Sequence, residues 1–349
     1  MKVEDFLVSE NATLVEALMR LDQTGKKCIF VVEGEGRLVG SLTDGDVRRR
    51  ILANGSLEGT AGQVANRSPV TAVRGDTLPT DLGVTAVPIL DVEGHVTDIV
   101  FSDGEVGKCR RPLPEPMPVV MMAGGVGSRL LPLTAILPKP LIPVNGTTIA
   151  ERIIERFRGS GCNDFYLVLN YKKGMIKAYF DDIERDYNVT YVEEEEFLGT
   201  GGGLKLVEPY LNSTFILTNC DILVDASVND LLEVHRRAKN AVTCVCSLKS
   251  FVVPYGTIEI SEGGQIEDMC EKPATSVLIN TGCYMVEPKV LDYIGENENI
   301  GFPDVMTRCQ KSGLKVGVFP ISEGAWLDMG QFDEMRRMND MLVGEREAF

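Results

Sequence analysis

The chemistry of this sequence is concentrated in residues 119–140, which read VVMMAGGVGSRLLPLTAILPKP. Four apolar residues predict a buried strand, and the glycines after it let backbone N–H groups close on phosphate oxygens, because no Cβ stands in the way. Arg129 and Lys139 add two cations beside that loop. The stretch therefore predicts a nucleotide or polyphosphate site, for which we expect backbone contacts from Ala123, Gly124, Gly125 and Gly127.

Two common phosphate-binding motifs do not account for this loop. A Walker P-loop requires G-x-x-x-x-G-K-[ST], which the stretch lacks. A dinucleotide-binding fingerprint requires a third glycine where Leu130 stands. The run instead resembles the signature of the sugar-1-phosphate nucleotidyltransferases, G-G-x-G-[ST]-R-L-x-P-L-T followed by P-K-P. The resemblance implies that Arg129 stabilises pyrophosphate and that Lys139 contacts the triphosphate near the reacting phosphorus.

Two aspartates resemble the metal ligands of the same family. Asp221 follows the apolar stretch 215–218, so the carboxyl end of a strand would place it near the glycine loop. Asp328 lies in the sequence WLDMG. Paired aspartates in the family hold Mg²⁺ between nucleotide and sugar phosphate, and Mg²⁺ accepts one or two carboxylates together with phosphate oxygens and water. The resemblance therefore implies an Mg²⁺ site at Asp221 and Asp328, with Asp221 also counted as catalytic.

A second glycine loop, LGTGGGL at residues 198–204, opens a predicted helix and resembles the family's L-G-T-A-G-A-L. The resemblance implies nucleotide contacts from Thr200 and Gly202. Gly201 and Gly203 stand where alanine or serine is usual, which predicts a looser loop. The acidic run 193–196 just before it is interpreted mainly as a solvated strand end.

Three short motifs resemble the sugar-binding parts of the family in the family order. They are Tyr255-Gly256, Glu271-Lys272-Pro273 and Asn280-Thr281-Gly282. The resemblance implies a catalytic Lys272 that grips the sugar phosphate. It also implies sugar contacts from Gly256, Glu271, Asn280 and Thr281.

The implied reaction needs no side-chain base. A sugar 1-phosphate has a second pKa near ~6, so it is already a nucleophile at neutral pH. Its oxygen would attack the α-phosphorus of a nucleoside triphosphate in line, with positioning and charge neutralisation as the catalytic devices. The chain has two histidines, His95 and His235, and their spacing does not indicate a zinc site.

The last two thirds of the chain alternate strand-like and helix-like segments, which predicts a mostly parallel sheet covered on both faces. The predicted strands are 119–122, 165–170, 190–193, 215–218, 242–248 and 316–319. The predicted helices are 149–158, 175–187, 228–239, 288–294 and 332–343. The alternation therefore predicts the α/β class, and the family resemblance implies a Rossmann-like, GT-A-like nucleotidyltransferase sheet.

The first third contains a weak internal repeat that resembles a tandem CBS (Bateman) module. A helix over 14–21, strands over 28–32 and 38–42, and a helix over 47–52 form the first copy. The resemblance implies that Thr43 and Asp46 of its T-x-x-D motif hold the phosphate and ribose of a regulatory nucleotide. A ligand-free dimerisation or spacer module is an equally weighted alternative.

The second copy departs from the pattern. It has strands over 86–90 and 96–101, but Pro79 and Gly83 interrupt its helix, and Ser102 and Glu105 replace the T-x-x-D residues. Alternating prolines then predict an extended spacer. The domains predicted from these features are 1–58 (first CBS domain), 59–106 (degenerate second CBS domain), 107–117 (proline-rich linker) and 118–349 (nucleotidyltransferase).

Composition limits the class of protein. The 349 residues carry a net charge of −16, which argues against a nucleic-acid binder. No apolar stretch is of membrane-spanning length and the N-terminus lacks a signal-peptide core. The nine cysteines form no C-x-x-C pair, which favours reduced thiols and a cytoplasmic protein. We expect a homo-oligomer that binds neither nucleic acid nor membrane.

The sequence thus predicts an enzyme that converts a nucleoside triphosphate and a sugar 1-phosphate into a nucleotide sugar and pyrophosphate with Mg²⁺. A CBS module before a short transferase resembles guanylyltransferases for mannose 1-phosphate or glucosamine 1-phosphate, including those of legionaminic acid synthesis. GTP is therefore the expected nucleotide, and UTP, CTP and dTTP stay open. The alternative from another class is a nucleotide-sensing regulatory protein with an inactive transferase domain.

Overall fold

The computed structural model describes residues 2–34, 36–73, 84–101, 113–330, 335, 336 and 338. The predicted linker up to residue 112, positions Pro79, Gly83, Ser102 and Glu105, and most of the predicted helix 332–343 lie outside these residues. The chain divides into two compact units. Unit 1 comprises Met1–Cys109, Ser247–Ile279 and Pro320–Gly324. Unit 2 comprises Arg110–Cys246, Asn280–Phe319 and Ala325–Phe349.

Unit 2 is built on a seven-stranded mixed sheet in the order β11-β10-β7-β12-β17-β14-β18. The strands in chain order are β7 (Val119–Met122), β10 (Asp164–Leu169), β11 (Asn188–Glu193), β12 (Phe215–Asn219), β14 (Val242–Val252), β17 (Ala274–Val286) and β18 (Val316–Ile321). Strands β11, β10, β7 and β12 pair in parallel, and β17 runs antiparallel to β12. The predicted α/β class with a central parallel sheet is confirmed.

Helices connect these strands, as the parallel pairing requires. Helix α5 begins after Thr148, whose side chain accepts the Glu151 N–H while the Glu151 carboxylate accepts the Thr148 N–H. Its buried face then packs on the core through Ile153 and Phe157. None of the described helices is long and apolar enough to cross a membrane. The other regular helices of unit 2 are α4 (Leu133–Ile136), α6 (Lys173–Asp182), α7 (Gly199–Lys205), α8 (Val228–Ala238) and α9 (Phe302–Lys311), beside α5 (Ile149–Arg158).

Short elements complete unit 2. The 3₁₀ segments of unit 2 are η2 (Ser128–Leu130), η3 (Lys139–Leu141), η4 (Glu208–Tyr210) and η5 (Pro288–Tyr293), while η6 (Glu323–Ala325) begins in unit 1 and ends in unit 2. The short strands form two pairs, β8 (Pro143–Val144) with β9 (Thr147–Thr148) and β13 (Ile222–Val224) with β19 (Trp326–Asp328). Two predicted helices differ from the structure. The predicted helix 288–294 is the 3₁₀ segment η5, and the predicted helix 175–187 ends at Asp182, where Ile183 turns to extended backbone.

Unit 1 contains the predicted CBS fold. The first three-stranded sheet consists of β1 (Leu7–Ser9), β2 (Cys28–Glu33) and β3 (Arg37–Thr43), and the second of β4 (Ala72–Val73), β5 (Ala86–Leu90) and β6 (Val96–Phe101). The helical segments are η1 (Val3–Phe6), α1 (Leu14–Thr24), α2 (Asp44–Asn54) and α3 (Ala61–Val64). Leu18, Ile29 and Leu42 bury the apolar faces of α1, β2 and β3 in one core.

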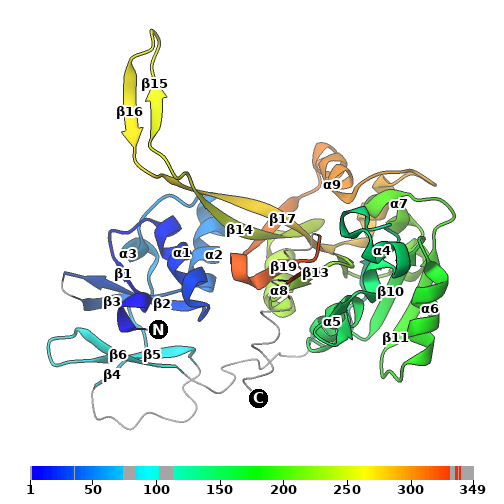
Figure 1. Ribbon diagram of the computed structural model, residues 1–349, viewed down its shortest axis with the longest axis horizontal. Helices are drawn as coiled ribbons and strands as arrows, with labels where there is room; N and C mark the ends of the chain where they lie inside the picture. The colour runs from blue at the N-terminus through cyan, green and yellow to red at the C-terminus, as the bar shows by residue number, and fades with distance from the viewer. Residues whose placement is uncertain are drawn as a thin grey trace. The chain divides into compact units, whose positions relative to one another are not determined.

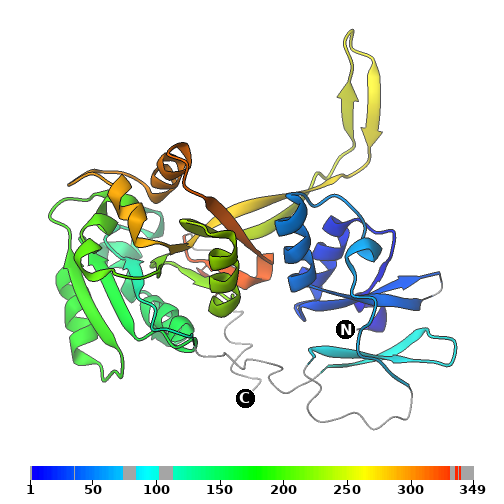
Figure 2. The same cartoon turned by 180° about the vertical axis from the view of Figure 1, so that it is seen from behind.

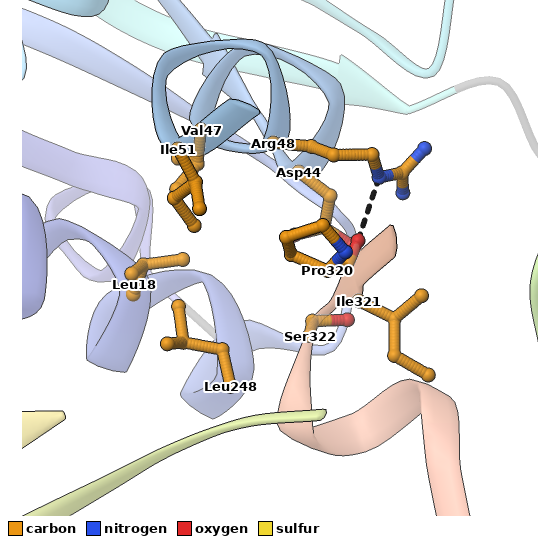
Figure 3. Close-up of a pocket in the computed structure, with 9 residues that line it drawn as sticks. All are labelled: Leu18, Asp44, Val47, Arg48, Ile51, Leu248, Pro320, Ile321 and Ser322. Atoms are coloured by element: carbon orange, nitrogen blue, oxygen red, sulfur yellow. Dashed lines mark hydrogen bonds between the residues drawn. The ribbon is translucent and has the colours of Figure 1, made fainter. Parts of the chain in front are cut away.

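Segments from the last two thirds of the chain complete unit 1. Leu248 at the far end of β14 joins the core of α1 and α2, and the Arg48 guanidinium donates to the Pro320 carbonyl at 2.7 Å. Figure 3 shows these groups around a small hollow. The hollow holds only about 10 Å³, roughly the space of one water molecule, so it is a packing seam and not a ligand pocket.

A β-hairpin of unit 1 carries little buried surface. It pairs β15 (Thr257–Ile260) with β16 (Ile266–Cys270), which connect β14 to β17 (Figures 1 and 2). Ile258, Ile260, Ile266 and Met269 are all exposed on it. Sequence periodicity did not predict these two strands, because neither strand buries one face and leaves the other in water.

Candidate active site

The glycine loop begins where β7 ends, at the carboxyl edge of the parallel strands. Gly127 adopts a left-handed φ of +68°, and a Cβ there would lie 2.8 Å from the Thr134 Cγ2 atom. A Cβ on Gly124 would lie 2.5 Å from the Glu194 Oε2 atom. The loop therefore needs glycine at these two positions, for backbone conformation at one and close approach at the other.

The loop borders an open cavity of about 180 Å³. The residues lining it are Met122, Gly124, Gly125, Gly127, Lys139, Glu194, Phe197, Gly199, Thr200, Asn219, Cys220 and Asp221. The structure thus brings together both glycine loops, one predicted cation and one predicted metal ligand. Ala123 is buried at the end of β7, and Arg129 is exposed in η2.

Lys139 and Asp221 form an ion pair at this cavity, although 82 positions separate them in the chain. Their side chains keep 14% and 19% of their surface exposed, so both can still meet a ligand. Asp328 lies beside them, because β19 pairs with β13 so that Asp328 is opposite Ile222, and the Met329 N–H donates to the Asp221 carbonyl at 2.8 Å. Two carboxylates, Asp221 in the turn before β13 and Asp328 on β19, fit the donor set that Mg²⁺ accepts with phosphate oxygens.

The second glycine loop is tighter than the sequence predicted. Residues 199–205 form helix α7, and Gly201 and Gly203 are buried. A Cβ on Gly201 would lie 2.9 Å from the Ile300 carbonyl oxygen, and one on Gly203 would lie 2.4 Å from Glu194 Oε1. The expectation of a looser loop is therefore wrong, because the missing methyl groups let neighbouring segments approach the helix.

The two predicted nucleotide contacts of α7 differ in position. Thr200 lines the cavity, and its hydroxyl oxygen also accepts the Phe302 N–H at 3.0 Å. Gly202 packs instead against the backbone of Glu298, whose carbonyl oxygen would lie 1.8 Å from a Cβ. The geometry gives Gly202 a packing role, while Thr200 faces the cavity.

Glu194 is the site residue that sequence reasoning missed. The acidic run was interpreted as solvated, but only 2% of Glu194 is exposed, and burial raises the pKa of its carboxyl group. The carboxylate lies between the two glycine loops and accepts the Leu198 N–H at 3.4 Å. Glu193, Glu195 and Glu196 are exposed as expected. The alternation along a strand end was the available signal, since Val192 and Glu194 share the buried face.

The N-T-G segment approaches the cavity through its glycine. Gly282 has a φ of +84°, and a Cβ there would lie 2.5 Å from Nδ2 of the cavity-lining Asn219. The Thr281 hydroxyl is buried and donates to the Val245 carbonyl at 2.7 Å, so it shapes the backbone here. Asn280 is exposed and accepts the Gly282 N–H at 3.0 Å. A sugar contact by Asn280 stays a prediction.

The remaining sugar-site residues lie in unit 1, at the base of the hairpin. Gly256 and Glu271 are neighbours there, since a Cβ on Gly256 would lie 2.9 Å from Glu271 Oε2. Lys272 is exposed with a left-handed φ of 49°, and its N–H donates to the Tyr255 carbonyl at 3.3 Å. The structure therefore joins the Y-G and E-K-P motifs to one another.

The predicted CBS nucleotide residues form a helix cap. The Thr43 hydroxyl and N–H donate to Asp46 Oδ2 at 2.6 and 2.9 Å, and Asp46 Oδ1 pairs with Arg49. This capping box explains why α2 begins at Asp44. It meets the hydrogen-bonding needs of both residues without a ligand, so their nucleotide role stays a prediction.

Sugar-1-phosphate nucleotidyltransferases are among the known proteins similar to this chain. Mannose-1-phosphate guanyltransferase of Pichia angusta is 34% identical over 61% of this chain, and UTP–glucose-1-phosphate uridylyltransferase of a Synechocystis species is 29% identical over 62%. Each match spans 60% of the relative's length. The crystal structure of HddC from Yersinia pseudotuberculosis shares the fold at a TM-score of 0.52 and 23% identity, over 65% of this chain and 99% of that one.

Two protein families match the chain directly. Residues 1–53 match the CBS domain. Residues 118–343 match the nucleotidyl transferase family, and this range covers the glycine loops, Lys139 and both aspartates. The chain therefore belongs to the nucleotidyl transferase family and carries a CBS domain at its N-terminus.

Proposed function

We propose that the protein transfers a nucleoside monophosphate from GTP to a sugar 1-phosphate, either mannose 1-phosphate or glucosamine 1-phosphate, and releases pyrophosphate. The curated relatives named as mannose-1-phosphate guanyltransferases support the reaction class. The match spans 60% of the length of these relatives.

One observation carries the proposal. A single cavity gathers residues of both glycine loops and the Lys139–Asp221 pair, and Asp328 lies on strand β19 opposite Ile222, the residue that follows Asp221. Together these groups suit a triphosphate and a divalent metal. When bound, Mg²⁺ would neutralise phosphate charge between the two substrates, with Asp221 and Asp328 as its protein ligands.

The side chains of this chain then position and neutralise the substrates. The sugar phosphate is dianionic near neutral pH, so its oxygen attacks the α-phosphorus as the bond to pyrophosphate breaks. Arg129 neutralises the leaving pyrophosphate and Lys139 the α-phosphate region. Lys272 holds the incoming sugar phosphate. These cations stabilise the negative charge that develops on the phosphates in the transition state, and we assign them this stabilisation as their main catalytic contribution.

Guanine is favoured by the buried carboxylate. Guanine presents two adjacent donors, N1–H and N2–H, and a carboxylate presents two acceptors that match them. Uracil and thymine present one donor between two carbonyl oxygens, which a carboxylate would repel. Glu194 lines the cavity beside Gly124 and Thr200, and the half-exposed Phe197 ring offers an apolar wall for a base. This arrangement supports GTP over UTP and dTTP.

The alternative is a nucleotide sensor built on an inactive transferase domain. Such a protein would bind nucleotide and lose the charges that act on the reacting phosphates. Arg129, Lys139, Asp221, Lys272 and Asp328 are all present in this chain, which favours the enzyme.

Pyrophosphate release from the full chain tests the proposal. Four nucleoside triphosphates should be combined with a panel of sugar 1-phosphates that includes mannose, glucosamine and glucose 1-phosphate. We expect GTP with one of the first two sugars to give the highest kcat/KM. Binding of GTP without pyrophosphate release from any combination would favour the sensor, and a preference for UTP, CTP or dTTP would overturn the base assignment.

Lys272→Ala and Lys139→Ala should affect different substrates. Lys272→Ala should raise the KM for the sugar 1-phosphate roughly tenfold or more, since a charge-assisted contact to phosphate contributes about 1.5–3 kcal/mol. Lys139→Ala should lower kcat and the use of GTP. Steady-state kinetics with each substrate varied separately distinguishes the two effects. Wild-type kinetics in both variants would refute the two assignments.

The CBS domain should bind at most one nucleotide, at Thr43 and Asp46. Calorimetry of the full chain with AMP, ATP and GMP should show a site that Asp46→Ala removes, because the substitution deletes both the proposed ribose acceptor and the carboxylate that accepts from Thr43 in the capping box of α2. Any effect of the ligand on transferase activity must also appear as an effect of substrates on ligand affinity. Unchanged calorimetry and kinetics in Asp46→Ala would identify the domain as structural.

A further inference from the structure

We infer that Tyr171 and Lys172 are positioning residues that hold the glycine loop in its nucleotide-binding shape. The two residues, here called the clasp, follow β10 and precede α6. They do not line the cavity in the part of the chain that the structure describes, so they act through the loop. That the loop binds a nucleotide rests on the proposed function. The contacts between the clasp and the loop do not depend on it.

The clasp touches both ends of the glycine loop. At the first end, the Tyr171 N–H donates to the Gly124 carbonyl at 3.3 Å. At the second end, the Tyr171 hydroxyl donates to the Thr134 carbonyl at 3.2 Å. One residue thus spans the loop from its first glycine to the start of α4, and fixes the separation of the two ends.

The Lys172 ammonium binds the second end of the loop. It donates to the carbonyls of Ala135 at 2.5 Å and Ile136 at 2.7 Å. These carbonyls lie in the last turn of α4, where helix carbonyls lack partners within the helix and carry partial negative charge. The ammonium also lies 5.3 Å from the centroid of the Tyr171 ring, so the two clasp side chains support one another.

The backbone of Lys172 adopts a left-handed conformation, which is unusual for a residue other than glycine. Lys172 has a left-handed φ of 49°, a backbone conformation that is unfavourable for a residue with a Cβ. A glycine or asparagine there would adopt this conformation more readily and remove the ammonium. The hydrogen bonds of the Lys172 ammonium to α4 offset this unfavourable backbone conformation.

Thr134 transmits the position of α4 to the middle of the loop. It is completely buried, and its hydroxyl donates to the Gly127 carbonyl at 2.9 Å. Its methyl group packs against Gly127, directly before the segment that carries Arg129. A displaced α4 would therefore move Gly127 and Arg129 together, and with them the proposed contacts to the triphosphate.

Limited trypsin digestion tests the clasp without requiring activity. Arg129 is the only trypsin site between residues 119 and 151, because Lys139 is followed by proline. Leu130 is fully buried, so cleavage after Arg129 requires local opening of the loop. Lys172→Met should accelerate that cleavage roughly 10- to 100-fold, as expected for loss of charge-assisted hydrogen bonds. Mass spectrometry of the fragment beginning at Leu130 measures the rate.

Three variants serve as references. Lys173→Met removes the neighbouring ammonium, which pairs with Glu193 at 2.7 Å instead of α4, and should cleave at the wild-type rate. Lys172→Arg keeps a charged group with N–H donors for the Ala135 and Ile136 carbonyls, so it should restore most of the protection against trypsin. Tyr171→Phe loses one hydrogen bond and should accelerate cleavage only a few-fold. Equal cleavage of Lys172→Met and Lys173→Met would overturn the inference.

Kinetics then separates positioning from general destabilisation. Lys172→Met should lower kcat/KM for GTP about tenfold and leave the KM for the sugar 1-phosphate unchanged, and Lys172→Arg should recover it. Equal losses for both substrates would contradict a role confined to the glycine loop. If the wild-type enzyme transfers no nucleotide at all, the proposed function fails, and the cleavage series still decides whether the clasp holds the loop.

Discussion

Asp221→Asn should reduce turnover by roughly 100- to 1,000-fold or more, because it removes an anionic ligand of the proposed Mg²⁺ ion, which would neutralise the phosphate charge. Asp221 pairs with Lys139 at the cavity and lies beside Asp328 through the β13–β19 pairing. Asp328→Asn should have an effect of the same order. Asparagine keeps an oxygen that can accept the Gly330 N–H, which Asp328 accepts at 2.8 Å, so the fold is preserved. Pyrophosphate release measures the turnover and thermal denaturation confirms folding.

Asp225→Asn is the matched control for these variants. Asp225 lies four residues after Asp221 and pairs with Arg156 at 3.4 Å on the outside of the cavity. It should retain wild-type turnover. EDTA should reproduce the loss in the wild-type enzyme, and added Mg²⁺ should reverse it. Full activity in EDTA would contradict the metal assignment, and full activity of a folded Asp221→Asn would remove Asp221 from the site.

The parts of the fold that sequence could predict are those encoded by local pattern. Residues 119–122 are a continuous apolar run and form the buried strand β7. Helix α5 has both a capping box and an apolar face, and its predicted bounds of 149–158 match the structure. The two CBS strands over 28–33 and 37–43 likewise follow from apolar runs around a glycine turn.

Strand β17 could not be predicted in the same way. Gly282 interrupts its 13 residues with a left-handed φ, and the sequence around it therefore resembles a turn. Antiparallel pairing with β12 holds the strand on the far side of that glycine. The information lies in a partner strand more than 50 residues earlier, which a local pattern does not contain.

The candidate site likewise contains residues that the sequence could identify and one that it could not. The glycine loop, Lys139 and Asp221 were identified from their sequence, and the structure places them around one cavity. Glu194 was hidden inside a run of four glutamates, since neighbouring charges usually indicate a solvated segment. Its burial results from close packing by Gly124 and Gly203, which approach from two other elements. Glycine contacts of this kind become visible only when the chain is folded.

Base preference should depend on this buried glutamate more than on any other side chain of the cavity. Glu194→Gln keeps the size of the side chain and replaces one of its two acceptor oxygens with a donor group. A guanine donor would then face a donor, so kcat/KM for GTP should fall about 10- to 100-fold, as expected for a lost charge-assisted hydrogen bond of about 1.5–3 kcal/mol. UTP should gain relative to GTP, because the amide can pair with both a uracil donor and a uracil carbonyl.

An exposed neighbour, Glu195, and the pH dependence of the KM for GTP provide the controls for this test. Glu195→Gln removes the same charge one residue away and should leave the GTP preference unchanged, since Glu195 points to solvent. Burial raises the pKa of Glu194, so its acceptor form is lost as the pH falls through that raised value. The wild-type KM for GTP should therefore rise toward acid pH, while the KM of Glu194→Gln, which has no such proton to gain, should not follow it. Competition between GTP and UTP in one reaction, measured against pH for the three proteins, gives the answer directly. An unchanged GTP preference in Glu194→Gln would show that backbone groups of the glycine loop, and not this carboxylate, select the base.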